Sequence, residues 1–292
     1  MYDYWQTFLN GYIGYFNYLW TSITEPSFYN YFYALIVISL LVFSLEILKP
    51  WRENQPKFRK DFWLDFFYMI FNFFLFSLLI YNASSDVVVK AFNDSLANIG
   101  ISNLVFISLE NLPYWLILLI GFALRDFIQW NVHRLLHRVS WLWEFHKLHH
   151  SVKEMGFAAH LRYHWMETVV YRTIEYIPLA LIGIGLYDFF YIHIFTIMIG
   201  HLNHANININ YGPLRYIFNS PQMHIWHHAQ SLPGNYKTGV NFGITLSIWD
   251  YLFKTDYIPY PGQNIELGFD GDEKYPKTFL KQITSGFSKS RK

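Results

Sequence analysis

Residues 125–170 decide the fold, and they read RDFIQWNVHRLLHRVSWLWEFHKLHHSVKEMGFAAHLRYHWMETVV. This stretch holds seven of the thirteen histidines of the 292-residue chain. His133 and His137 are four residues apart, and His146 is followed closely by His149 and His150. Side chains three or four residues apart share one face of an α-helix, so each group would present its imidazoles in one direction. Neutral imidazoles arranged in this way are typical of metal ligands.

A third group, His224, His227 and His228, repeats the pattern later in the chain. A single histidine pair on a helix is usually a pair of solvent-facing polar residues, but three such groups in one chain are improbable as coincidence. Eight imidazoles exceed the three or four protein ligands of one zinc ion, so the spacing predicts a dinuclear site. Imidazole suits iron, zinc and copper, and the spacing alone does not choose among them.

The composition is typical of a membrane protein, with 53% hydrophobic, 21% aromatic and only 15% charged residues. A net charge of +1 gives no reason to expect a nucleic acid partner. The absence of cysteine from the sequence excludes disulfides, thiolate metal sites and cysteine-ligated iron–sulfur clusters. The metal site must therefore be built from nitrogen and oxygen ligands.

Hydropathy predicts membrane spans at 31–48, 62–80 and 112–124. Eighteen helical residues reach about 27 Å and can just cross a bilayer core of about 30 Å. The basic cluster within 49–60 predicts that this loop is cytoplasmic, and the weakly charged stretch 81–103 is expected to be a loop on the other side. The third span then ends on the cytoplasmic side.

Beyond this span the same helical face would carry Asp126, Trp130, His133 and His137 into the cytoplasm. For the third histidine group to reach the same site, 168–200 must form a hairpin, either two tilted spans or a re-entrant pair. Residues 1–30, rich in aromatic side chains, are either an interfacial segment or a poorly ordered tail.

We therefore predict an all-α fold: a multi-pass integral membrane helical bundle of about four to five spans with a cytoplasmic, histidine-rich di-metal cap. The expected divisions are an amino-terminal membrane region at 1–111, a catalytic domain at 112–255 and a cytoplasmic tail at 256–292.

The histidine groups resemble those of the fatty acid hydroxylase and sterol desaturase superfamily of membrane-bound di-metal oxygenases. Four smaller elements are also similar to this family: 162–167, 204–206, 241–243 and 248–255, although Trp165 replaces a usual Pro and Lys254 a usual Gly. The resemblance covers about 112–255. It implies two iron ions, with zinc as an alternative, and the use of O2 and two external electrons to hydroxylate or desaturate a lipid.

The predicted metal ligands are the eight histidines of the three groups and one or more further histidines. His204 is the first choice because it precedes the last group and lies in a family-like element, and His164 and His201 follow. His160 and His193 are expected to be structural. The complete candidate set is His133, His137, His146, His149, His150, His204, His224, His227, His228, His164 and His201.

Metal-bound imidazoles usually donate their second N–H to a carboxylate or carbonyl group. The candidates for this supporting role are Asp126, Glu167, Asn241 and Asp250. For Asp126, an ion pair with Arg125 or solvation at the helix end is an equal alternative.

The predicted function is oxygen-dependent lipid hydroxylation or desaturation, with electrons from a separate ferredoxin- or cytochrome-type donor and its reductase. An ether-cleaving alkylglycerol-type monooxygenase, a zinc-stabilised structural membrane protein and a metal transporter are the alternatives. A transporter needs ionisable residues near the bilayer midplane. Here, apart from Asp188 and His193, such residues lie at the ends of the predicted spans.

Overall fold

The computed structural model describes residues 2–101, 104–184, 186–236 and 238–287, and it is helical throughout these ranges apart from turns, loops and three isolated β-bridges. The predicted all-α class is confirmed. The helices are α1 (Tyr2–Thr24), α2 (Tyr31–Leu48), α3 (Phe62–Ile70), α4 (Asn82–Asn98), α5 (Tyr114–Arg138), α6 (Ser140–His150), α7 (Trp165–Leu181), α8 (Leu186–His204), α9 (Pro221–His227), α10 (Ile248–Phe253) and α11 (Phe279–Ile283). Short 3-10 helices lie at Phe157–Leu161, Gly212–Tyr216, Gly234–Tyr236 and Asp272–Lys274.

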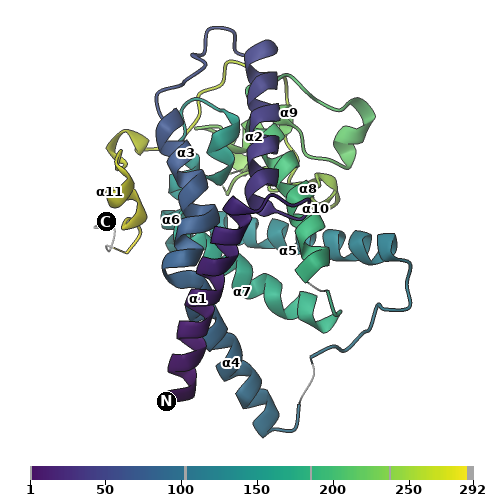
Figure 1. Cartoon of the computed structure of the whole chain (residues 1–292). Coiled ribbons are helices and arrows are strands. Elements are labelled where there is room, and N and C mark those ends of the chain that lie inside the picture. Colours follow the sequence, from purple (N-terminus) through teal and green to yellow (C-terminus); the bar gives the residue numbers. More distant parts are fainter. Residues whose placement is uncertain (1, 102–103, 185, 237, 288–292) are drawn as a thin grey trace.

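Three helical segments of the described ranges are long and apolar enough to cross a membrane: Tyr31–Leu48, Phe62–Asn98 and Tyr114–Arg138. The expected hairpin at 168–200 is present as the helix pair α7 and α8, and neither helix is among these three. Figure 1 shows α5 running across the direction of α2 and α3. Helix α5 packs against α6, α7 and α8, so it connects the histidine-bearing elements.

The second membrane segment is longer than predicted. Its 37 residues include α3, α4 and two π-helical stretches, Phe71–Leu75 and Ser77–Tyr81. The prediction of a loop at 81–103 is therefore wrong, because Asn82–Asn98 is helical. Polar residues in this stretch suggested a loop, but α1 packs along α4, and Lys90 pairs with Asp3 at 2.8 Å and with Asp94 at 3.0 Å. These interactions favour the helix.

The π-helical stretch connects the membrane segment to the histidine-bearing region. A π-turn widens the helix locally, and such turns often occur at functional sites. Buried Asn72 lies in the first stretch and donates hydrogen bonds to the carbonyl oxygens of Leu161 at 2.9 Å and Tyr163 at 2.8 Å. The residue between these two carbonyls is Arg162, which takes part in the metal centre.

Two hydrophobic clusters hold the histidine-bearing elements. One joins α2, α3 and α8 through Leu35, Phe62 and Ile197. The other joins the segment after α6 to α9 through Val152, Ile225 and Trp226. Burying a large apolar side chain of the second, non-membrane cluster contributes about 1.5–3 kcal/mol. The metal centre lies among helices fixed by both clusters.

Candidate metal centre

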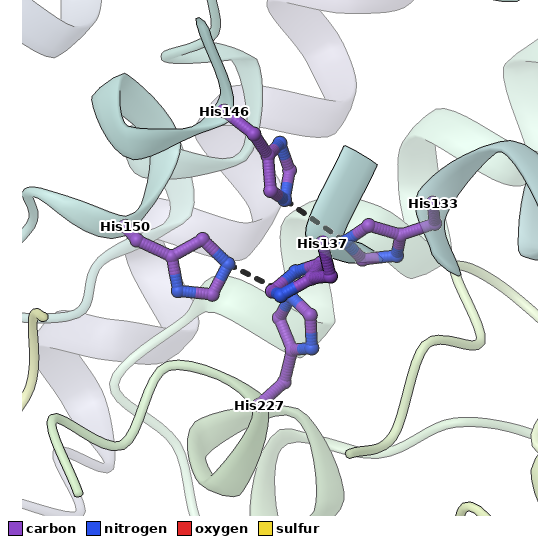
Figure 2. Close-up of side chains that lie close together, drawn as sticks. All are labelled: His133, His137, His146, His150 and His227. Atoms are coloured by element: carbon purple, nitrogen blue, oxygen red, sulfur yellow. Dashed lines mark hydrogen bonds between the residues drawn. The ribbon is translucent and has the colours of Figure 1, made fainter. Parts of the chain in front are cut away.

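Nine histidines meet in two groups, contributed by α5, α6, α8, α9 and the residue after α9. Within each group all ligand nitrogens lie within 4.8 Å of one another. Figure 2 shows the five imidazoles of the first group pointing toward a common centre. The five-histidine group is His133, His137, His146, His150 and His227, and the four-histidine group is His149, His204, His224 and His228.

Adjacent histidines serve different groups. His149 and His150 are neighbours on α6, and His227 and His228 are neighbours at the end of α9, yet each pair is divided between the two groups. Successive residues of a helix point in different directions, whereas residues three or four apart share a face. One His-x2-His-His motif can thus supply ligands to two ions that lie side by side.

Hydrogen bonds define which nitrogen of several imidazoles carries the proton. Nδ1 of His133, His149, His204 and His227 lies 2.7–3.1 Å from a backbone carbonyl oxygen, so it must be the N–H donor. The acceptors are the carbonyls of Phe242, Arg162, Gly200 and Val240 respectively. The Nε2 atom of each ring therefore carries a lone pair and faces the centre of its group.

Within each group, the unprotonated nitrogens of two histidines face each other. Nε2 of His133 lies 3.1 Å from Nε2 of His146, and Nε2 of His149 lies 3.3 Å from Nε2 of His204. Nδ1 of His146 lies 2.8 Å from a Glu167 oxygen, so Nε2 of His146 is unprotonated when that carboxylate is ionised. Two facing lone pairs cannot hydrogen-bond to each other. A cation between them resolves the contact, because an ion bound at about 2.1 Å holds two nitrogens roughly 3 Å apart.

A proton does not fill this role near neutral pH. Burial lowers the pKa of both His146 and His149 to about 3, because the protein interior disfavours the charged imidazolium. Nε2 of His137 is also buried and has no hydrogen-bond partner within the described residues. The donor set thus fits two metal ions held by neutral nitrogen ligands.

Glu167 is the predicted supporting carboxylate that contacts a group member directly. It lies in the first turn of α7, where its Oε1 accepts from the backbone N–H of His164 at 3.2 Å. Its Oε2 accepts from Nδ1 of His146 at 2.8 Å. A carboxylate in this position orients the ring and increases the basicity of its other nitrogen.

Asp250 supports the five-histidine group indirectly, through the backbone of Phe242. Its carboxylate accepts from the backbone N–H of Phe242 at 2.9 Å and of Gly243 at 2.7 Å, and from Nε1 of Trp130 at 3.0 Å. It thereby fixes the Phe242 peptide, whose carbonyl accepts from His133. Burial raises the pKa of Asp250.

Asp126 and Asn241 support loops. Asp126 accepts from Nε1 of Trp249 at 2.9 Å and from the backbone N–H groups of Thr245 and Leu246. Asn241, at φ 54°, bonds Met223 and Tyr257. Among the described contacts neither side chain bonds a group histidine, which differs from the expected direct support.

Two of the eleven ligand candidates, His164 and His201, lie outside the two groups. His164 caps α7: its Nδ1 accepts from Met166 N–H at 3.1 Å and its Nε2 donates to the carbonyl of Ile283 at 2.8 Å. His201 bonds His160 at 2.8 Å and lies 3.3 Å from Ser39 Oγ. Both histidines lie outside the two groups because their nitrogens are engaged elsewhere.

Sequence reasoning missed the role of Arg162. Its guanidinium donates to Asp61 at 3.0 Å, Asp65 at 2.9 Å and Ser151 at 2.9 Å, and its carbonyl accepts from His149. The carboxylates raise the pKa of Arg162, so this buried side chain stays charged. Arg162 could have been noticed in the sequence, because it is a charged residue within a family-like element. The carbonyl groups that accept from the histidines could not, because every residue has a backbone carbonyl.

Residues 118–255 match the fatty acid hydroxylase family model. This region is similar to a fatty acid hydroxylase domain. All nine histidines of the two groups lie within the matched region. No solved structure matches the chain significantly.

Two relatives illustrate the range of the family. The chain is 37% identical over 171 residues to the ornithine lipid hydroxylase OlsE of Rhizobium tropici, covering 58% of this chain and 50% of the relative. It is 32% identical over 133 residues to the alkylglycerol monooxygenase of Homo sapiens, covering 44% of this chain and 28% of the relative. The aligned regions thus span half or less of these relatives.

Proposed function

We propose that this protein is an integral membrane oxygenase that hydroxylates a lipid, using two iron ions bound by the five-histidine and four-histidine groups. The observation that carries the proposal is the pair of facing, unprotonated Nε2 contacts, His133 with His146 and His149 with His204. Both contacts need a cation. Nine neutral nitrogens and no carboxylate within the groups suit a divalent transition metal rather than calcium or magnesium.

The proposed reaction is R–H + O2 + 2 electrons + 2 H⁺ → R–OH + H2O. A C–H bond and the O–O bond break, a C–O bond forms, and one oxygen atom leaves as water. When bound, the two irons supply the reductive activation of O2. A separate one-electron carrier of the ferredoxin or cytochrome type, with its reductase, is the proposed electron source.

The protein side chains orient the ligands and exclude water. Eight of the nine histidines are buried, and only His137 is partly exposed. Glu167 and four backbone carbonyls hold the rings of His146, His133, His149, His204 and His227 in position. A ligand shell fixed before the metal binds needs little rearrangement during the reaction.

The substrate class follows from the domain and the relatives. One relative is named an ornithine lipid hydroxylase and another an alkylglycerol monooxygenase, and both names refer to molecules with long apolar chains. Three helices that are apolar enough to span a membrane support a lipid substrate. Hydroxylation is preferred to ether cleavage because the relative with the higher identity is named a hydroxylase.

We place the metal centre on the cytoplasmic side. The basic loop at 49–60 is expected to be cytoplasmic. This loop contacts the segment after α8: Trp51 N–H donates to the Asn206 carbonyl at 3.0 Å, and Arg52 N–H donates to Asn206 Oδ1 at 2.9 Å. His204 is two residues away from this contact, so the metal centre and the basic loop share one side.

Metal analysis and oxygen uptake of the purified protein test the proposal. We expect two irons per chain, and oxygen consumption that requires a reductant and a membrane lipid extract. His149→Ala and His228→Ala should each lose metal and activity while the protein still inserts into membranes. Tightly bound zinc without turnover, or full activity in both variants, would overturn the proposal.

A further inference from the structure

A buried polar stripe leads away from the five-histidine group along α5. Arg125, Gln129, His133 and His137 follow one another at intervals of four residues and share one helix face. With a rise of about 1.5 Å per residue, Gln129 lies about 6 Å and Arg125 about 12 Å from His133 along the helix axis. Both lie toward the apolar half of α5.

Helix α7 carries a matching stripe. Glu167, Tyr171 and Glu175 are also four residues apart, and α7 packs against α5. Glu167 contacts His146 of the metal centre, and Glu175 contacts Gln129 at the other end of the stripe. The polar surface between the two helices therefore extends from the five-histidine group to the Gln129–Glu175 pair.

The far end of the stripe is a cluster of Arg125, Gln129 and Glu175, which are 5%, 6% and 4% exposed. Nε2 of Gln129 donates to Oε1 of Glu175 at 2.6 Å, and Arg125 Nε lies 3.4 Å from Oε2 of Glu175. Arg125 also donates to Thr196 Oγ1 at 3.2 Å. Gln129 Oε1 and Arg125 Nε have no hydrogen-bond partner within the described residues.

Stability does not explain this cluster. A buried ion pair contributes little net stability, because desolvation of the two charges offsets their attraction. Burying charged groups is costly, so a buried charged cluster needs a further explanation. An unpaired buried oxygen on Gln129 adds a further cost, which a ligand would relieve.

The unused atoms specify the chemistry of the ligand. Arg125 offers a donor, so the ligand needs an acceptor, and Gln129 Oε1 needs a donor on the ligand. The opposite charges of Arg125 and Glu175 cancel, so the cluster does not favour a ligand with net charge. A secondary amide offers one carbonyl and one N–H with no net charge.

We propose that Arg125, Gln129 and Glu175 form a subsite for the polar group of the lipid substrate, and that this subsite takes the amide of an N-acylated lipid. The inference rests on the proposed lipid hydroxylation and adds the substrate class. The amide carbonyl accepts from Arg125, and the amide N–H donates to Gln129 Oε1. The acyl chain then extends from this subsite toward the five-histidine group.

The test compares an amide-linked lipid with its ester-linked analogue, identical in acyl chain, using the iron-loaded protein in detergent. The ester lacks the N–H, so Gln129 Oε1 stays unpaired, and sites built around such a bond discriminate strongly against its loss. We expect kcat/KM to be at least about tenfold higher for the amide. Equal kcat/KM values for the two lipids would overturn the subsite.

A variant provides the second readout. Gln129→Met keeps the side-chain length but removes the acceptor, so the preference for the amide over the ester should be lost, while iron content stays unchanged. Asn131→Leu is the matched control, because Asn131 lies on the same helix and, among the contacts of the described residues, donates to the Phe127 carbonyl of α5. A retained amide preference in Gln129→Met contradicts the subsite. Loss of turnover on every lipid in the native protein would instead overturn the proposed function, and the inference with it.

Discussion

At the scale of single residues, Glu167 is the side chain whose effect on the metal is easiest to isolate. Glu167→Ala removes the acceptor of His146 Nδ1–H, and loss of such a partner lowers metal affinity by about 10–100-fold. Metal content after mild chelation should fall from two ions per chain toward one, because the four-histidine group has other supports. Glu144→Ala is the control, since Glu144 pairs with Lys147 on the surface of α6. Two ions retained in Glu167→Ala would contradict the assigned role.

Lys254 allows a stability prediction. It ends α10 at φ 55°, a left-handed conformation that costs a residue with a Cβ atom about 1 kcal/mol. Lys254→Gly should therefore raise the free energy of unfolding by up to about 1 kcal/mol, less the greater chain entropy of glycine in the unfolded state. Thermal unfolding in detergent measures this change. Lys254→Ala keeps the Cβ atom and should give no gain.

The sequence predicted that the nine histidines cluster and that Glu167 supports them. It did not predict how the histidines divide between the two groups. Helical spacing shows which residues share a face, and it correctly grouped neighbours such as His133 and His137. It shows that His149 and His150 point in different directions, but not which other histidines each one meets, because that depends on how the helices pack. His164 lies outside the two groups and caps α7, and the sequence could not show this because a histidine that caps a helix and one that binds metal look alike in sequence.

At the scale of elements, the carboxy-terminal helix α11 contacts the start of α7, which the composition of this segment does not predict. The carbonyl of Ile283 accepts from His164 Nε2 at 2.8 Å and from Trp165 Nε1 at 2.9 Å, and Gln282 Oε1 accepts from Tyr68 OH at 2.9 Å. The Pro- and Gly-rich tail suggested a solvated segment, because a helix of five residues gives almost no periodic signal.

Deletion of residues 277–292 should therefore destabilise the protein. Each lost hydrogen bond contributes about 1 kcal/mol, and the buried N–H groups of His164 and Trp165 would lose their acceptor. The apparent Tm of the purified protein should fall clearly, and Gln282→Ala should give a smaller fall because it leaves Ile283 in place. An unchanged Tm after the deletion would show that α11 does not support α7.

At the scale of the whole molecule, the side of the membrane on which the metal centre lies can be tested directly. The chain has no cysteine, so single cysteines can be introduced without background labelling. Lys57 precedes the Phe62–Asn98 segment and Asn98 ends it, and the 37 residues of this segment reach about 55 Å, which exceeds the bilayer core. Ser140 begins α6 beside the metal centre. With a membrane-impermeant maleimide, Ser140→Cys should label from the same side as Lys57→Cys and the opposite side from Asn98→Cys. Labelling of Ser140→Cys with Asn98→Cys would place the metal centre on the other face.

The geometry of the whole site also predicts where on the lipid oxidation occurs. The polar group is held at Gln129 and Arg125, about 6–12 Å along α5 from His133, so the distance from the polar end to the metal is fixed by a rigid helix. In a series of amide lipids of increasing acyl length, the hydroxyl group should stay at one carbon number counted from the amide carbonyl. Mass spectrometry of the derivatised products measures this position. Gln129→Met should spread the product over neighbouring carbons, while Asn131→Leu should not. A hydroxyl position that instead stays constant from the methyl end means that the chain terminus, rather than the Arg125–Gln129–Glu175 cluster, sets the register.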